Sequence, residues 1–600
     1  MIDNVTYSVG KHVFTGGVSF ESMSFDNSYV RLGTSYYRYN SVASFLSGGA
    51  PSSYGVTYPY SNDTWAKLRF GMAGVYVQDK ITVSPKFNLT VGLRADLPLY
   101  FDEPLQNPSI DTLKLLDRAG NQTTYPSASW PKSRLLLSPR VGFNWDVYGN
   151  KSLQVRGGTG IFAGLVPFVW FTNQPSNSGV LQNTFEPVNN ATLAQITRLE
   201  ADPMYWVKAL PNSFPTTSGQ RAPSSIALID PEFKMPQIWR TNIGADWKVP
   251  GTPLVATVDL LFSKDIKSVY QFNANRKAAD GSLSYSGDDR DFWNGAANAT
   301  YNTATGAIAP VLANSDKGYS ATITAGFSLP YRKGFYGSVF YNFTAAKDIT
   351  GNPGSAANSA WSNNYSINDP NEQYLSTSQF GVPHRVTGNL SYRIEYLKHL
   401  ATTVSLFYNG SSAGRFAYTY NGDINRDGVS LDLLYVPENS ADLTFVPFTN
   451  GGVTFSAEQQ RAAYDKLVEN TPALKNAKGG YVERNSGLLP WQHRFDFRLL
   501  QDIFTNVGKN RHSLQLSVDI LNVGNMINND WGLRKELNSG SSFNYALLNV
   551  AGVTAAGVPT FNMISIADAA GARVLPETPY RTWYDPRNTW SMQVGLRYTF

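Results

Sequence analysis

The segment DINRDGVSLD carries the sharpest arrangement of metal-ligating side chains in the sequence. Its acidic and amide residues stand at positions 1, 3 and 5 of a calcium-binding type of loop, and Gly428 at position 6 allows the sharp turn. Position 12 is Leu434 instead of the usual bidentate glutamate, so the ligand set is incomplete. The spacing predicts either a calcium site or a plain extracellular turn without metal. The candidate ligands are Asp423, Asn425, Asp427, the carbonyl of Val429, and Asp432 as a substitute for the glutamate.

Aromatic side chains crowd a second segment, which spans about residues 165–235. Two interpretations stay open, because such rings can stack on a bound ligand or pack the segment against itself. The rings concerned are Phe168, Trp170, Phe171, Tyr205 and Trp206.

Motifs for catalysis are weak. The pattern G-x-S-x-G occurs at Gly410–Gly414, but no helical pattern follows it, so a small-residue loop is favoured over a nucleophile elbow. The glycine-rich run GGTGIFAG lacks the strand–helix–strand context of a nucleotide-binding motif. The five histidines are scattered and match no zinc spacing.

Composition narrows the class of protein. Aromatic residues make up 13% of the 600 residues, and cysteine is absent, as expected in a compartment where thiols are oxidised. The net charge is only +5 and no basic block occurs, which argues against a nucleic-acid partner. No run approaches the roughly 18 apolar residues of a membrane helix. Strands that alternate apolar and polar residues stay compatible with membrane insertion.

Alternation of that kind recurs along the whole chain. SPRVGFNWDVYGNKSLQVRGG and GVYVQDKITVSPKFNLTVGLRADL each predict two amphipathic strands joined by a short turn. Long polar segments separate such hairpins, and structureless connections of this length are rare in compact soluble domains. The pattern predicts an all-β, antiparallel transmembrane barrel with about 15 strands, short periplasmic turns and long extracellular loops. The loops are expected at about 26–64, 99–134, 165–235, 267–318, 348–382, 413–490 and 524–588.

One of these loops contains a helix signal. Ser456 followed by Gln459 forms a capping box, and the next residues allow a short helix that ends before Pro472. We expect a surface helix on the mouth of the barrel.

The final residues, TWSMQVGLRYTF, are the most regular strand of all. Every second residue from Trp590 to Phe600 is apolar, and the residues between them are polar or small. Most chains end in frayed, polar residues, so this ending calls for a specific role.

Several phrases, taken together and in order, resemble the barrel of TonB-dependent outer-membrane transporters, and specifically the Oar-like branch. Among them are LLLSPRVGFNWDVYGNKSLQVRGGTGIFAG, FKMPQIWRTNIGADWKVPG, LFSKDIKSVY, NSDKGYSATIT, PHRVTGNLSYR and NGDINRDGVSLDLLYVP. The likeness runs from about residue 11 to residue 600. The resemblance implies that the last strand is read by the barrel-assembly machinery, with Leu596, Tyr598 and Phe600 as its signal.

Full members of that family also carry a signal peptide, a small sandwich domain, a TonB box and a plug, and none of these is visible in this sequence. Such barrels have about 22 strands. Residues 1–600 are therefore expected to be the C-terminal portion of a barrel.

The resemblance implies a transporter in the outer membrane of a Gram-negative bacterium, energised through TonB, with outer-membrane lipid, the assembly machinery and an unidentified ligand as partners. Calcium is the only cofactor that the residues suggest. A static structural or adhesion barrel is the alternative, followed by an outer-membrane barrel enzyme, for which no convergent catalytic group is evident.

Overall fold

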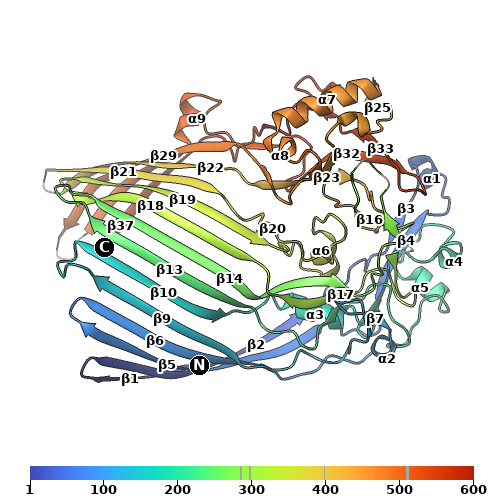
Figure 1. The fold of residues 1–600 in the computed structure, drawn as a ribbon, viewed down its shortest axis with the longest axis horizontal. Helices are drawn as coiled ribbons and strands as arrows, with labels where there is room; N and C mark the ends of the chain where they lie inside the picture. The colour runs from blue at the N-terminus through green and yellow to red at the C-terminus, as the bar shows by residue number, and fades with distance from the viewer. Residues whose placement is uncertain (284, 286, 296–298, 398, 509–511) are drawn as a thin grey trace.

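A curved wall of long β-strands is the framework of the protein (Figure 1). The computed structural model describes residues 1–600 except 284, 286, 296–298, 398 and 509–511. In these residues one sheet holds 18 strands, of which β12, β17 and β20 are short pieces of loops and the rest form the wall. The wall strands are β1 (Ile2–Val9), β2 (His12–Asn27), β5 (Ala66–Ser84), β6 (Phe87–Tyr100), β9 (Leu136–Asp146), β10 (Leu153–Ala163), β13 (Gln237–Lys248), β14 (Val255–Asn273), β18 (Tyr319–Arg332), β19 (Phe335–Asp348), β21 (His384–Tyr396), β22 (Leu400–Ser412), β29 (Trp491–Val507), β30 (His512–Leu521) and β37 (Ser591–Thr599).

Each wall strand pairs antiparallel with the next wall strand along the chain, as β9 does with β10 and β13 with β14. Tight turns join the pairs at one end of the wall. Gly149 and Gly251 lie in two of these turns with φ of +80° and +73°, a conformation that glycine adopts without steric cost. Long loops join the strands at the other end. The predicted fold class, with its short turns, long loops and number of strands, is confirmed.

The outward face of the wall is apolar. On β13, Trp239, Ile243 and Trp247 expose 44%, 47% and 43% of their surface and stand on one side of the strand. A soluble protein would bury such a row, whereas in an outer-membrane barrel the outward row meets lipid.

The inward face is polar and carries ion pairs within and between the wall strands. The Arg156 guanidinium of β10 lies 2.8 Å from the Asp259 carboxylate of β14 and also contacts Asp246 of β13. Arg94 and Asp96 form a further ion pair, at 2.6 Å, within the single strand β6. These groups line the lumen.

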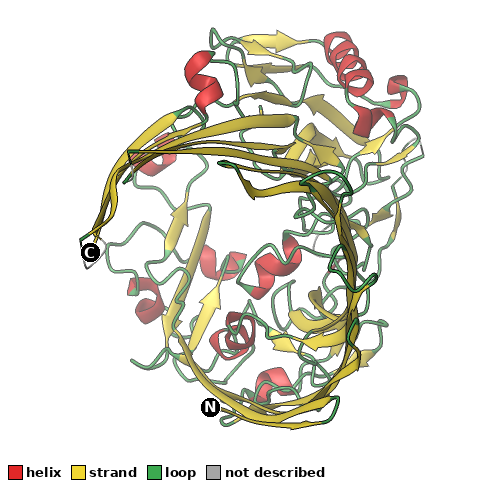
Figure 2. Ribbon diagram, turned by 90° about the vertical axis from the view of Figure 1, so that its left-hand side faces the viewer, coloured by secondary structure: helices red, strands yellow, loops and turns green. Residues whose placement is uncertain are grey.

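The wall does not close on itself. Within the described residues β1 pairs only with β2, and β37 pairs only with β30. Figure 2 shows the wall as an incomplete ring, with the N-terminus and the C-terminus near its two ends. The outer edges of β1 and β37 therefore have no partner strand in this structure.

The loops fold into layers over the extracellular end of the wall. None of the helices in the described part of the chain is long and apolar enough to cross a membrane. The helices are α1 (Val42–Leu46), α2 (Pro108–Asp111), α3 (Val169–Ser176), α4 (Asn190–Leu193), α5 (Tyr205–Ala209), α6 (Ala357–Ser362), the 3₁₀ helix η2 (Ser440–Asp442), α7 (Ala457–Asn470), α8 (Pro472–Lys475) and α9 (Val523–Ile527). The loop strands are β3 (Tyr36–Arg38), β4 (Ser53–Pro59), β7 (Leu115–Leu116), β8 (Gln122–Thr123), β11 (Gln182–Phe185), β12 (Leu228–Ile229), β15 (Gly281–Ser282), β16 (Asp291–Phe292), β17 (Pro310–Ser315), β20 (Ser376–Thr377), β23 (Arg415–Asn421), β24 (Tyr435–Val436), β25 (Phe448–Asn450), β26 (Val453–Phe455), β27 (Gly480–Tyr481), β28 (Gly487–Leu488), β31 (Lys535–Leu537), β32 (Asn544–Val553), β33 (Pro559–Met563), β34 (Ile566–Ala567), β35 (Arg573–Val574) and β36 (Tyr580–Thr582).

The largest loop layer has a core of its own. The strands β28, β23, β32 and β33 form one small sheet, in which β23 and β32 run parallel although more than 100 residues separate them. Helix α7 packs Tyr464 and Leu467 into this core, and the capping box between Ser456 and Gln459 is present. The predicted surface helix is therefore confirmed.

Candidate functional site

The predicted calcium loop folds as a tight turn in the largest loop layer. The Asp423 carboxylate accepts hydrogen bonds from the N–H groups of Asp427, at 3.0 Å, and Gly428, at 2.7 Å. The side-chain oxygen of Asn425 accepts from the same Asp427 N–H at 3.1 Å. Gly428 has φ of +91°, as the sharp turn requires. The structure thus gathers the predicted ligands at positions 1, 3 and 5 around one backbone turn.

The remaining predicted ligands lie on the next turn of the chain. The Asp432 carboxylate accepts a hydrogen bond from the Ile424 N–H at 3.2 Å, and Val429 donates its N–H to the Asp427 carboxylate at 2.6 Å. Within the described residues, no group of three or more His, Cys, Asp or Glu side chains is arranged to hold a metal ion.

A cation from the protein itself already contacts this loop. The Arg276 guanidinium donates to the Asp427 carboxylate at 2.5 Å, and it lies between the rings of Trp293 and Trp361, 5.0 and 5.4 Å from their centres. Burial raises the pKa of Asp427 to about 7, against the opposing effect of Arg276. A calcium ion that used Asp427 as a ligand would therefore have to compete with this guanidinium.

Calcium binding stays a prediction, and Arg276→Gln tests it. At an effective dielectric constant of 20, a unit positive charge repels a divalent ion about 4 Å away by about 8 kcal/mol, so calcium should bind at least about tenfold more tightly once the guanidinium is removed. The variant should also unfold at a lower temperature without calcium, because the buried Asp427 carboxyl and the rings of Trp293 and Trp361 lose the guanidinium that they contact.

Titration calorimetry and thermal unfolding of both proteins in detergent measure these effects, with the exposed Lys114→Gln as the matched control. Calcium heat and a calcium-dependent rise in unfolding temperature are expected for Arg276→Gln. No calcium heat in either protein would leave the loop as a plain turn.

The loop aromatics are mainly packed against other side chains. Phe168 and Phe171 belong to a buried cluster at the loop end of β5, and Trp206 belongs to a separate buried cluster. These three residues expose at most 6% of their surface, so the packing interpretation describes them. Trp170 and Tyr205 are only partly buried, and ligand contact by these two rings stays a prediction.

The last strand presents its apolar row outward as its alternation predicts. Leu596, Tyr598 and Phe600 all lie largely exposed on the outer face. The Tyr598 hydroxyl and the His512 Nδ1 lie 2.8 Å apart across the β30–β37 pair. Their role as an assembly signal stays a prediction.

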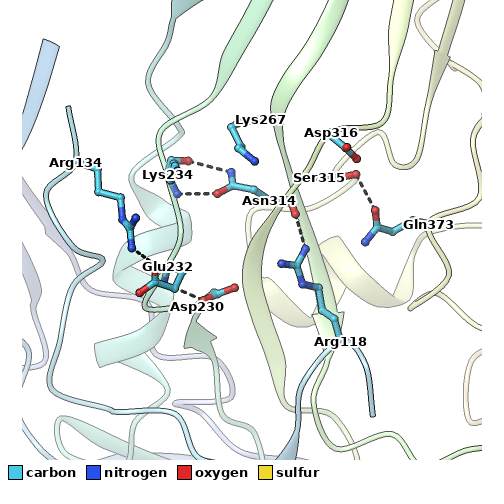
Figure 3. Close-up of a pocket in the computed structure, with 10 residues that line it drawn as sticks. All are labelled: Arg118, Arg134, Asp230, Glu232, Lys234, Lys267, Asn314, Ser315, Asp316 and Gln373. Atoms are coloured by element: carbon cyan, nitrogen blue, oxygen red, sulfur yellow. Dashed lines mark hydrogen bonds and ion pairs between the residues drawn. The ribbon is translucent and has the colours of Figure 1, made fainter. Parts of the chain in front are cut away.

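A polar cavity of about 400 Å³ lies at the loop end of the wall, at the edge of β17 (Figure 3). Asn314 of β17 fixes the neighbouring segment, because its side-chain amide accepts from the Lys234 N–H at 2.6 Å and donates to the Lys234 carbonyl at 2.9 Å. Arg118 donates to the Asn314 carbonyl at 2.7 Å. The residues that line the cavity are Arg118, Arg134, Asp230, Glu232, Lys234, Lys267, Asn314, Ser315, Asp316 and Gln373.

Charge in this cavity is divided into paired and unpaired groups. Glu232 forms ion pairs with Arg134 and with Lys132, the latter at 2.7 Å. The ammonium groups of Lys234 and Lys267 have neither an ion pair nor a hydrogen bond within the described residues. Burial raises the pKa of Asp230, and the positive charge of Arg118 opposes that rise.

The sequence analysis did not single out this cavity. Its lining comes from separate segments, none of which has a local motif. One signal was present, because the family-like phrases FKMPQIWRTNIGADWKVPG, LFSKDIKSVY and NSDKGYSATIT contribute Lys234, Lys267 and Asn314, respectively.

The antiparallel wall, its apolar outer face and its polar inner face define an outer-membrane β-barrel. Residues 1–545 match the family described as outer membrane beta barrel domain, and the chain belongs to that family. Its place is the outer membrane of a Gram-negative bacterium.

Comparison with curated proteins finds no match. Among solved structures, the chain is similar to the outer membrane transporter YddB from Escherichia coli, with 13% identity over 100% of this chain and 54% of that one, and a TM-score of 0.46. A variant of the ferric enterobactin receptor PfeA from Pseudomonas aeruginosa shows 9% identity over 99% and 53% of the two chains, with a TM-score of 0.41. The FrpB iron transporter from Neisseria meningitidis shows 11% identity over 87% of this chain and 49% of that one, with a TM-score of 0.37. The chain spans about half the length of these solved chains.

Proposed function

We propose that the chain forms the barrel of an energy-coupled transporter that moves a ligand across the outer membrane. The observation that carries the proposal is the polar inner face of the wall, where pairs such as Arg156 with Asp259 leave a lumen suited to hydrophilic solutes. Folded loops with a polar cavity cover the extracellular end, where a ligand would arrive first.

The finer assignment, TonB dependence and the Oar-like branch, rests on the sequence phrases quoted above. The proposed partners are outer-membrane lipid, the barrel-assembly machinery, the TonB complex and a ligand. The proposal assigns the chain no catalytic role.

A static structural or adhesion barrel is the second candidate. One observation favours it, because the largest loop layer contains a buried ion pair. Arg290 is fully buried there and pairs with Asp288 at 2.9 Å. Such a rigid layer also suits a fixed binding surface.

Uptake by living cells distinguishes the two candidates. Spent medium that contains peptides, oligosaccharides and metal chelates is compared by mass spectrometry after growth of wild-type, gene-deleted and TonB-deficient cells. We expect at least one solute to be consumed by the wild type and by neither mutant, and the restored gene to recover its consumption. Identical consumption of solutes with and without the gene contradicts transport. A solute that TonB-deficient cells still consume, and gene-deleted cells do not, contradicts coupling to TonB.

A further inference from the structure

The cavity at the edge of β17 holds more positive charge than its ion pairs use. Lys234, Lys267 and Arg118 line it, and none of the three forms an ion pair within the described residues. Arg118 is held in place by its hydrogen bond to the Asn314 carbonyl. In Figure 3 these cations surround one space and approach it from different chain segments.

The positions of these cations are fixed by the fold. Lys234 is anchored at its backbone by both hydrogen bonds to the Asn314 side chain. Lys267 precedes Ser268, which pairs with Ser315 in the β14–β17 register. Lys267 belongs to β14, and Lys234 lies in the segment just before β13, where the hydrogen bonds to Asn314 hold its backbone. Little backbone order therefore has to be gained when a ligand binds.

Lys234 and Lys267 are partly buried, and a partly buried ammonium group without a partner is costly because it loses water and gains no opposite charge. Within the described residues, the acidic side chains of the cavity form no ion pair with Lys234 or Lys267. Glu232 is committed to Arg134 and Lys132. Asp230 and Asp316 form no ion pair within the described residues, which leaves them as acceptors for N–H or O–H groups of a ligand.

We propose that this cavity binds an oxyanion group, a carboxylate or a phosphate, of a ligand that also carries hydrogen-bond donors. The ammonium groups of Lys234 and Lys267 contact the oxyanion as point charges, and the planar guanidinium of Arg118 donates hydrogen bonds to it. Asp230 and Asp316 face the donor groups, together with Ser315 and Gln373, which are joined by a hydrogen bond of 2.7 Å from the Ser315 hydroxyl to the Gln373 side-chain oxygen. The volume of about 400 Å³ accommodates a small organic anion or the charged end of a longer one. This inference deepens the proposed transport function and rests on it for the fate of the ligand.

Titration calorimetry with citrate and with inorganic phosphate tests the proposal on protein purified from outer membranes in detergent. We expect saturable binding of at least one probe that weakens as salt is raised, because salt screens partly exposed charges. Lys234→Gln and Lys267→Gln should each weaken binding at least about tenfold, the loss of one charge-assisted hydrogen bond. Lys267→Arg should retain most of the affinity, and the exposed Lys114→Gln, which lies outside the cavity, should bind like the unchanged protein.

A parallel titration in nanodiscs distinguishes a soluble ligand from a lipid headgroup. Competition by phosphatidylglycerol discs, but not by phosphatidylcholine discs, would identify the bound oxyanion as a lipid phosphate. Binding that is equal in both discs identifies a soluble ligand.

Absence of binding by both probes, or equal affinity for the Lys→Gln variants and the unchanged protein, overturns the proposal. These outcomes are separate from the uptake experiment. Oxyanion binding without TonB-dependent uptake would remove only the transport function, and uptake without oxyanion binding would remove only this site.

Discussion

The 600-residue chain by itself is expected to give no stable, uniform pore in a planar bilayer. The reason lies in the two open edges of the wall, on β1 with 8 residues and β37 with 9 residues. In an antiparallel strand about half of the backbone groups point to each side, so each edge presents roughly eight unpaired N–H and C=O groups. Each such group costs several kcal/mol in lipid, and the total exceeds the 5–15 kcal/mol that typically stabilises a folded protein.

Single-channel conductance of the refolded chain measures this expectation, together with its size distribution in detergent. We expect aggregation or heterogeneous, short-lived openings. Protein extracted from the outer membrane of the producing bacterium is the control, because there every edge must have found a partner. A single reproducible conductance level from the refolded chain would contradict the prediction, since it would show that β1 and β37 pair with each other.

The wall could be predicted from the sequence because its two faces meet two different media. Trp239, Ile243 and Trp247 face lipid while Asp246 faces the lumen. Apolar and polar residues therefore alternate along the strand with a period of two. The helix that begins after Ser456 could be predicted for a local reason as well, since a capping box involves residues three positions apart.

The end of β14 shows where that period fails. The strand continues to Asn273, past the position where the sequence predicts a loop from about residue 267. Its final part pairs with β17 and is covered on both faces, with Tyr270 and Phe272 in one buried cluster and Val269 beside another. A strand covered on both faces has no polar side, so alternation cannot mark it.

The candidate sites depend on contacts that no local pattern records. Arg276 contacts Asp427 although the two residues are 151 positions apart in the sequence. Because of this contact, one of the predicted calcium ligands already binds a cation of the protein itself. The oxyanion cavity likewise needs Arg118, Lys234 and Lys267 from three separate segments. Loop layers are built from long-range packing, and their sites become visible only in the folded protein.

Tyr598→Asp and deletion of Phe600 are expected to remove most of the protein from the outer membrane. If the last strand is the signal for the assembly machinery, either change prevents recognition, and the protein stays unfolded in the periplasm. Heat-modifiable migration and protease protection of outer-membrane fractions measure the folded amount. Normal levels of folded barrel in both variants would contradict the assembly role.

The size of the effect separates recognition from stability. A charged residue on the lipid face of a barrel costs about 0–1 kcal/mol near the interface and about 2–4 kcal/mol at the midplane for Arg or Lys, with Asp and Glu costing less. Losing the contact with His512 adds about 0.5–1.5 kcal/mol. Together these effects lower the stability of a folded barrel only modestly and do not account for a near-complete loss.

Tyr341→Asp on β19 is the matched control, because the Tyr341 hydroxyl contacts His384 at 2.7 Å in the same way as Tyr598 contacts His512 at 2.8 Å. Both tyrosines also expose about half of their surface on the outer face, at 42% and 53%. Tyr341→Asp therefore carries the same chemical change on an internal strand. Near-normal levels of Tyr341→Asp beside loss of Tyr598→Asp assign the effect to the position of the last strand. Equal losses in the two variants would instead assign it to the charge in lipid, and the assembly signal would have to be sought elsewhere in the chain.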